Sequence, residues 1–123
     1  MAAARYLAVL LWLLVPPALA ADAFVAGIND LPLMPGLRAM PGDGMVFDAP
    51  AGRIVEAWAE GAVAREAVLS FYRTTLPQLG WRAAGPDLFR REAETLRLEF
   101  PVSGPRGDRG SGTLLIRFYL SPG

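Results

Sequence analysis

Three residue types that carry much of protein chemistry are missing from this 123-residue sequence, which contains no cysteine, no histidine and no lysine. Without cysteine there is no disulfide, no thiolate nucleophile and no thiolate zinc site. Without histidine the commonest general base and the commonest transition-metal ligand are absent, and without lysine no Schiff base forms. Only carboxylate, Tyr, Arg and hydroxyl chemistry remains. We therefore assign no catalytic residue, no metal ligand and no cofactor, and we favour a protein that is not an enzyme.

An excess of charge of either sign is lacking as well. The twelve basic residues, all of them Arg, balance twelve acidic residues, and the formal net charge is zero. Proteins that bind nucleic acid through its phosphates show a basic patch or stripe, and the scattered arginines form no such run. We expect no nucleic-acid partner. The length leaves room for one small folded domain.

The first 21 residues have the three parts of a secretory signal peptide. Arg5 supplies the positive charge, residues 6–15 form an apolar core, and Ala18-Leu19-Ala20 is a small-residue cleavage site. The alternative is an uncleaved anchor, but a membrane span needs ~20 apolar residues and this core is shorter. We predict a cleaved signal peptide at residues 1–21, a periplasmic mature protein and no stable membrane span after cleavage.

Residues 22–44 form a segment rich in proline and glycine, including the stretch Asp30-Leu31-Pro32-Leu33-Met34-Pro35-Gly36-Leu37. Its prolines preclude a regular helix or a central strand. A flexible linker would be polar, whereas this segment also carries apolar residues, namely Ile28, Leu31, Leu33, Met34 and Leu37. We therefore predict an apolar arm at residues 22–44 that packs along a folded domain at residues 45–123.

Residues 63–81 have the pattern of a helix with one buried stripe. Its members recur at spacings of three and one and are Val68, Phe71, Tyr72, Thr75, Leu76 and Leu79. The opposite side is mostly polar and contains Arg65, Glu66, Ser70, Arg73, Thr74 and Gln78. Pro77 should end the helix near Leu76, because proline lacks the backbone N–H and crowds the preceding turn. Gly80 then provides a left-handed exit.

Short apolar or alternating runs predict strands on both sides of this helix. Before it, residues 45–47 and 53–60 flank the turn sequence Asp48-Ala49-Pro50-Ala51-Gly52 and form a hairpin. After it, strands are expected at residues 81–84, 88–92, 95–102 and 113–120. The predicted fold is α+β, with one helix packed on a small, mostly antiparallel sheet in the order β-β-α-β-β-β-β.

The loop at residues 103–112, SGPRGDRGSG, has the composition of a disorder-prone segment. It contains Arg106-Gly107-Asp108, which matches an adhesion tripeptide. A three-residue match arises easily by chance in a loop built from these residue types, so the sequence does not decide whether the tripeptide has a role.

Alternation along two predicted strands places four large apolar residues on the face of the sheet opposite the helix. These are Ile54 and Trp58 from one strand, and Leu115 and Tyr119 from another. A contiguous patch of this kind indicates a protein partner, either an envelope protein or a second copy of the chain. The alternative is that the arm folds over this face.

Two carboxylates, Glu56 and Glu60, flank Trp58 and superficially suggest a sugar site with an aromatic platform. Four residues apart in a strand, they would stand about 13 Å apart. The carboxylate pairs of glycosidases stand ~5–9.5 Å apart. We therefore assign no acid–base pair on this strand.

Three stretches, Asp30 to Leu37, Phe47 to Ile54 and Phe71 to Trp81, give the chain a resemblance to small exported proteins of alphaproteobacteria, a family without an assigned activity. The resemblance covers most of the mature length and implies a periplasmic location. We hypothesise a non-catalytic binding or envelope-assembly module. The alternative is a small non-metal enzyme or apolar-ligand carrier that uses carboxylate and Tyr groups. Buried, coupled carboxylates would indicate the enzyme, and an apolar cavity under the helix the carrier.

Overall fold

The computed structural model of the chain describes residues 24–105, 107–108 and 112–123. The predicted signal peptide at residues 1–21 and Arg106 of the tripeptide lie outside these residues. One helix, α1 (Arg65–Thr75), continues into a 3₁₀ turn, η4 (Leu76–Leu79), and another 3₁₀ turn, η3 (Pro41–Asp43), lies earlier in the chain. The strands are β1 (Arg38–Ala39), β2 (Met45–Ala49), β3 (Gly52–Gly61), β4 (Arg82–Gly85), β5 (Leu88–Arg91), β6 (Glu94–Glu99), β7 (Ser103–Gly104), β8 (Gly107–Asp108) and β9 (Leu114–Pro122).

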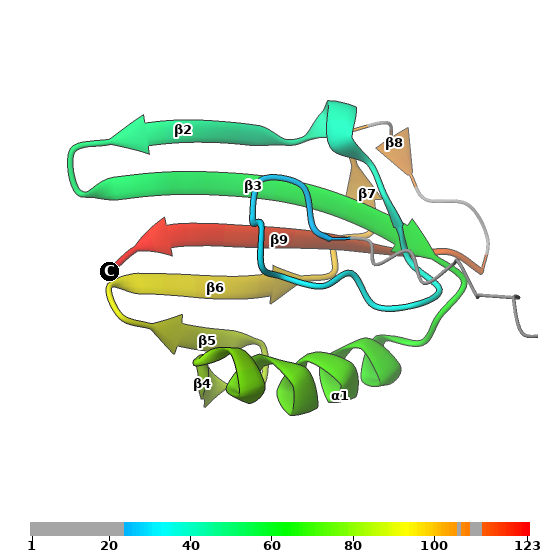
Figure 1. Cartoon of the computed structure of the whole chain (residues 1–123). Coiled ribbons are helices and arrows are strands. Elements are labelled where there is room, and N and C mark those ends of the chain that lie inside the picture. Colours follow the sequence, from blue (N-terminus) through cyan, green and yellow to red (C-terminus); the bar gives the residue numbers. More distant parts are fainter. Residues whose placement is uncertain (1–23, 106, 109–111) are drawn as a thin grey trace, which may run out of the picture.

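Within the described residues the main sheet has seven antiparallel strands, and the last strand of the chain lies in its middle (Figure 1). β9 pairs with β3 on one side and with β6 on the other, and β5 and β4 follow outward from β6. β1 and β2 both pair with the other side of β3, β1 near its end and β2 near its start. The predicted α+β class, the antiparallel sheet and the β2–β3 hairpin are confirmed.

The helix ends as its sequence predicts. α1 stops at Thr75, Pro77 lies in the 3₁₀ turn, and Gly80 closes that turn with φ +93°, a conformation that glycine adopts without steric cost. The buried stripe differs from the prediction at Leu69, which is buried, and at Phe71, Thr75 and Leu79, which are only half-buried. Because both the sheet and the arm contact the helix, its covered surface is wider than one stripe.

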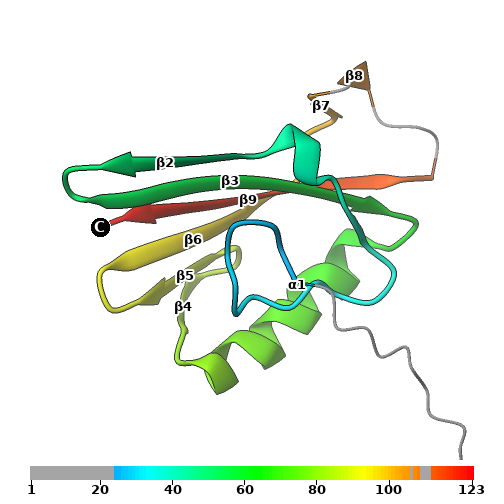
Figure 2. The same ribbon diagram turned by 45° about the horizontal axis from the view of Figure 1, so that its top comes forward.

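The helix and the arm cover the same face of the sheet, which we call the inner face (Figure 2). The buried cluster on this face takes side chains from the arm (Val25, Ile28, Leu31, Leu33), from the helix and its turn (Val68, Tyr72, Leu76), and from the central strands (Val55, Ala57, Phe118, Leu120). The prediction that the arm packs along the domain is confirmed. The alternative that the arm folds over the opposite face is wrong, because its apolar residues are buried beside the helix.

The hydroxyl of Tyr72 fixes the arm to the helix. It donates a hydrogen bond to the Pro32 carbonyl at 2.9 Å and accepts one from the Met34 N–H at 3.1 Å. Burial raises the pKa of this hydroxyl well above its ordinary value, although the Met34 N–H acts in the opposite direction. Tyr72 is therefore a neutral group that satisfies two backbone atoms of the arm.

Arg91 of β5 makes a second connection to the arm. Its Nη1 lies 2.6 Å from Asp30 Oδ2 and donates to the Leu79 carbonyl at 3.1 Å. Its guanidinium also lies over the Trp81 ring, 4.3 Å from the centroid. The hydrogen bond from Arg91 lowers the pKa of Asp30, and it outweighs the opposing effect of burial. One guanidinium thus joins the arm, the end of the helix and the residue before β4.

Candidate functional site

The four residues predicted to form a partner surface all lie on the face of the sheet opposite the helix, which we call the outer face. They are Ile54 and Trp58 of β3, and Leu115 and Tyr119 of β9. The register places Trp58 opposite Arg117 and Tyr119 opposite Glu56. Because charged residues lie between them, the four side chains form two apolar ends rather than one contiguous patch.

An ion-pair triad centred on Arg117 occupies the middle of the outer face. Arg117 Nε lies 2.5 Å from Glu56 Oε2, and its Nη1 pairs with a carboxylate oxygen of Glu99. The guanidinium also lies over the Tyr119 ring, 4.6 Å from the centroid. Burial alone would lower the pKa of Arg117, but the hydrogen bonds to the two carboxylates outweigh it and raise the pKa. Both carboxylates are therefore engaged in ion pairs and not placed as an acid–base couple.

The β7–β8 hairpin covers the Trp58 end of the outer face. Gly104 lies so close that a Cβ at this position would stand 2.5 Å from Leu115 Cδ2 and 3.2 Å from the Trp58 ring. Leu115 is consequently only 3% exposed, so its expected place on an open surface is corrected. The covering segment is neither the arm nor a partner but part of the loop that the sequence indicated to be disorder-prone. Gly107 and Asp108 of the adhesion-like tripeptide form β8 in this hairpin.

The other end of the outer face is open. Ile54 and Tyr119 are half-buried there, and β2 adds Met45 and Phe47, which are 53% and 55% exposed. Phe47 lies directly opposite Ile54 in the β2–β3 ladder, so the two side chains are cross-strand neighbours on one face. We call Met45, Phe47, Ile54 and Tyr119 the outer patch.

Sequence reasoning placed Ile54 and Tyr119 on this surface but missed Met45 and Phe47. The signal that locates them is the two-residue turn at Pro50 and Ala51, which sets Ala49 opposite Gly52. Counting back from that pair puts Phe47 opposite Ile54. The short run at residues 45–47 is apolar throughout and shows no alternation. Its pattern therefore did not indicate which of its residues point to the outer face.

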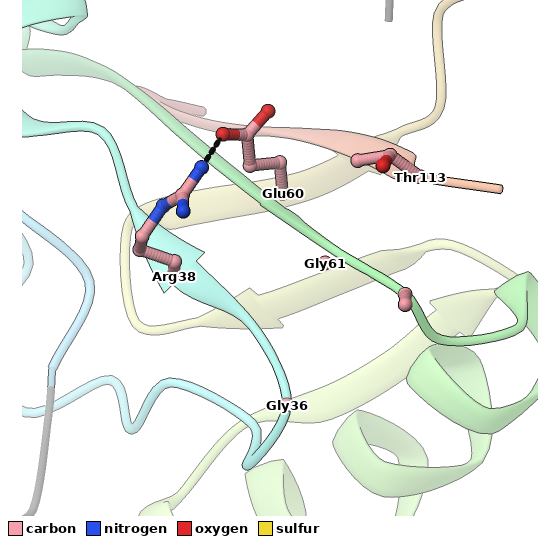
Figure 3. A pocket seen from close by; sticks show the side chains of 6 residues that line it. Gly36, Arg38, Glu60, Gly61 and Thr113 are labelled. Carbon is pink, nitrogen blue, oxygen red and sulfur yellow. Dashed lines mark hydrogen bonds and ion pairs between the residues drawn. The ribbon is translucent and has the colours of Figure 1, made fainter. Parts of the chain in front are cut away.

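A polar cleft of about 280 Å³ lies at the far end of β3 (Figure 3). It is lined by Gly36, Arg38, Glu60, Gly61, Ala62 and Thr113. Arg38 and Glu60 are cross-strand partners of β1 and β3, and their side chains point toward each other in an ion pair. Because each charge neutralises the other, this pair gives the cleft no net charge with which to attract an ionic ligand.

Two smaller cavities also lie at the margins of the sheet. One of about 240 Å³ adjoins Val63 and Leu114, and one of about 140 Å³ lies where Gly27 of the arm approaches Val46 of β2. Between the helix and the sheet, by contrast, Tyr72 and Phe118 pack edge to face with their ring centroids 5.5 Å apart. Side chains therefore fill the space in which an apolar-ligand carrier would hold its ligand.

The described residues lack several features that would indicate other functions. None of their charged side chains is buried, and they contain no group of three acidic residues placed to hold a metal ion. No helix in this part of the chain is long and apolar enough to cross a membrane. Comparisons of the chain with family models, with curated proteins and with solved structures give no match.

Proposed function

We propose that this protein is an exported, non-catalytic binding module that docks a protein partner of the bacterial envelope on its outer patch. The proposal depends on one observation: the two ends of the outer face differ in how far other parts of the chain cover them. The hairpin closes one end, the Arg117 triad neutralises the middle, and the outer patch leaves Met45 and Phe47 more than half exposed. Exposed apolar side chains that lie together at a strand pair are typical of a surface that another protein covers.

The composition of the outer patch supports a protein partner. Aromatic residues and Met are enriched at the centres of protein interfaces, where they fill pockets on the partner. Here Phe47, Tyr119 and Met45 supply such groups. Glu56 lies between Met45 and Tyr119 in the ladder, and its charge is paired with Arg117, which also pairs with Glu99. This arrangement favours the binding module over the enzyme or the carrier, because the outer carboxylates are paired and the space under the helix is filled.

The binding proposal is tested by capture from an envelope extract. We expect Ile54→Ser and Tyr119→Ser each to reduce recovery of the captured partner by about tenfold or more. The matched control is Phe24→Ser, which also removes an exposed apolar side chain (49% exposed) but lies away from the outer patch. Equal recovery with all three variants and the unchanged protein would contradict the proposal.

The location is tested separately, because it depends on the sequence of residues 1–21. Mass spectrometry of the protein from its native host should find an N-terminus near Ala21 or Asp22. Recovery of a chain that starts at Met1 and stays in the membrane fraction would contradict export with cleavage.

A further inference from the structure

Strand β2 is an apolar edge of the sheet. Its residues Met45, Val46 and Phe47 are 53%, 61% and 55% exposed, and within the described residues β2 pairs only with β3. An edge strand presents unpaired N–H and C=O groups to any chain that approaches it, and proteins usually protect such an edge with charge, proline or a covering segment. In β2 the only charged residue is Asp48.

The ladder shows which backbone groups of β2 point away from the sheet. In an antiparallel pair, residues alternate between exchanging hydrogen bonds with the partner strand and directing them outward. Ala49 pairs with Gly52 across a two-residue turn, and such a flanking pair exchanges both bonds. Phe47 and Met45 lie two and four residues before Ala49, so their N–H and C=O groups point toward β3 as those of Ala49 do. The N–H and C=O groups of Val46 and Asp48 are therefore directed outward.

An independent hydrogen bond supports this assignment of inward-facing and outward-facing residues in β2. The carbonyl of Trp58 accepts the N–H of Met40 at 2.9 Å, so Trp58 directs its backbone groups toward the edge on which β1 and β2 lie. Ile54 and Glu56 direct theirs the same way because they lie four and two residues before Trp58 in the same strand. Their partners in β2 are Phe47 and Met45, which leaves Val46 and Asp48 as the outward-facing residues.

We propose that a second copy of this chain occupies the β2 edge, in an antiparallel pair with a two-fold axis at Phe47. In this register each Val46 lies opposite the other copy's Asp48, and both residues exchange backbone hydrogen bonds because both face outward. The two Phe47 residues then form a non-hydrogen-bonded pair, the arrangement in which cross-strand side chains lie closest. Both aromatic side chains lie on the outer face.

Two other symmetric registers are disfavoured by residues next to β2. An axis at Asp48 would set two carboxylates directly opposite each other, which is destabilising. An axis at Val46 would bring the η3 turn (Pro41–Asp43) alongside the other copy's Ala49 and hairpin turn. The axis at Phe47 avoids the facing carboxylates and shifts the η3 turn past the strand, so that Asp43 lies opposite the other copy's turn residue Ala51 instead of opposite Ala49 in the paired strand. Once Arg5 is removed with the predicted signal peptide, eleven Arg and twelve acidic residues leave a net charge of −1, which adds little long-range repulsion between copies.

The area available sets the strength of this association. Stable interfaces bury ~1,200–2,000 Å² in total, and two five-residue edge strands with three exposed apolar side chains each cover less than that. We therefore expect a weak dimer, with a dissociation constant on the order of 10–100 µM. This pairing brings the outer patches of the two copies side by side. A second copy of the chain is thus the first partner that we assign to the proposed binding surface, and the inference rests on the proposed function.

Cysteine cross-linking tests the register. Because the native chain has no cysteine, a disulfide in a single-Cys variant joins two copies. In Phe47→Cys the paired Cα atoms would lie ~4.5 Å apart, within the range that a disulfide spans. The matched control is Met45→Cys on the same strand and face, because Met45 pairs with the other copy's Ala49 and lies about 13 Å along the strand from its own equivalent. We expect cross-linking of Phe47→Cys to be at least about tenfold faster; equal rates would overturn the proposal.

Sedimentation of the purified protein tests the pairing itself. Val46→Pro removes an outward N–H without removing a bond to β3, and proline is tolerated at such edge positions. We expect Val46→Pro to raise the dissociation constant by about tenfold or more, and Val46→Thr, which keeps the N–H and the branched shape, to change it less than about threefold. Asp48→Pro provides a second outward position if Val46→Pro fails to fold. Equal effects of proline and threonine, or a monomer at every concentration, would overturn the proposal.

The two proposals fail in different ways. A purified protein that stays monomeric, while Tyr119→Ser still loses the captured partner, would overturn self-pairing and leave the proposed function in place. If Val46→Pro lowers capture from the extract while the purified protein is monomeric, the edge binds a different protein and the second copy is excluded. A dimer with no dependence of capture on the outer patch would overturn the proposed function.

Discussion

Phe118 and Tyr119 are neighbours in β9, yet they lie on faces of the sheet with opposite properties. Phe118 is fully buried on the inner face, where the helix and the arm both pack. Tyr119 is half-buried on the outer face, beside a charged triad and two exposed residues of β2. A single strand, β9, thus contributes both to the buried core and to the proposed binding surface. We expect substitutions on the inner face to change stability, and substitutions on the outer patch to change binding.

The largest expected effect tests this separation directly. Phe118→Ala should lower the free energy of unfolding by about 3–5 kcal/mol, because it removes a buried aromatic side chain and leaves a cavity. Tyr119→Ala, one residue away, should lower it by no more than about 1 kcal/mol, since it removes partly exposed contacts and a partly exposed cation–π interaction. Chemical denaturation of both variants measures the difference. Similar losses would show that the two faces contribute equally to stability.

The second effect concerns the arm. Tyr72→Phe keeps the ring in the core but leaves the Pro32 carbonyl and the Met34 N–H without their shared partner. We expect a loss of about 1–3 kcal/mol, the usual result of leaving buried polar groups unsatisfied. Hydrogen exchange should increase at Met34 relative to the central strands. Unchanged exchange there would mean that apolar packing alone holds the arm.

A smaller effect is expected where the outer face is covered. Gly104→Val would place side-chain atoms into the space of Leu115 and Trp58. We expect a loss of about 1 kcal/mol, the low end for overpacking, because the nearest atom is the flexible end of a Leu side chain. Trp58 fluorescence should shift as the hairpin moves. A variant with unchanged stability and spectrum would show that the hairpin covers this end only loosely.

The smallest effect is a pH dependence of the arm contact. Because Arg91 lowers the pKa of Asp30 in the folded protein, this pair stabilises the fold above the unfolded pKa of ~3.9. That contribution is lost as the pH falls through the lower, folded value. The pair is solvent-exposed, so the effect should stay below about 1 kcal/mol. Stability of Asp30→Asn compared with the unchanged protein at pH 6 and pH 3 measures it; an equal difference at both values would contradict this assignment.

The sequence predicted the elements that depend on neighbours along the chain. The 3₁₀ turn at Pro77, the left-handed Gly80 and the β2–β3 turn all follow from local backbone chemistry. Alternation also placed Ile54 and Tyr119 on one face. It did not show what covers each face, because coverage depends on contacts between distant segments. The burial of Leu115 under Gly104, the position of the arm beside Tyr72, and Met45 and Phe47 at an open edge were therefore missed or left undecided.

The central position of β9 has a consequence for how the protein folds. The two strands that flank β9 cannot join into one sheet until the last strand of the chain is present. The arm, which is made early, docks on Tyr72 and Arg91, which follow their arm partners by 40 and 61 residues. Contacts between such distant residues slow folding, because a long loop must close before they form. We therefore expect slow folding that waits until β9 has been synthesised, with the edge strand and arm exposed during that interval. A chaperone that holds extended apolar segments would act on the protein at this stage.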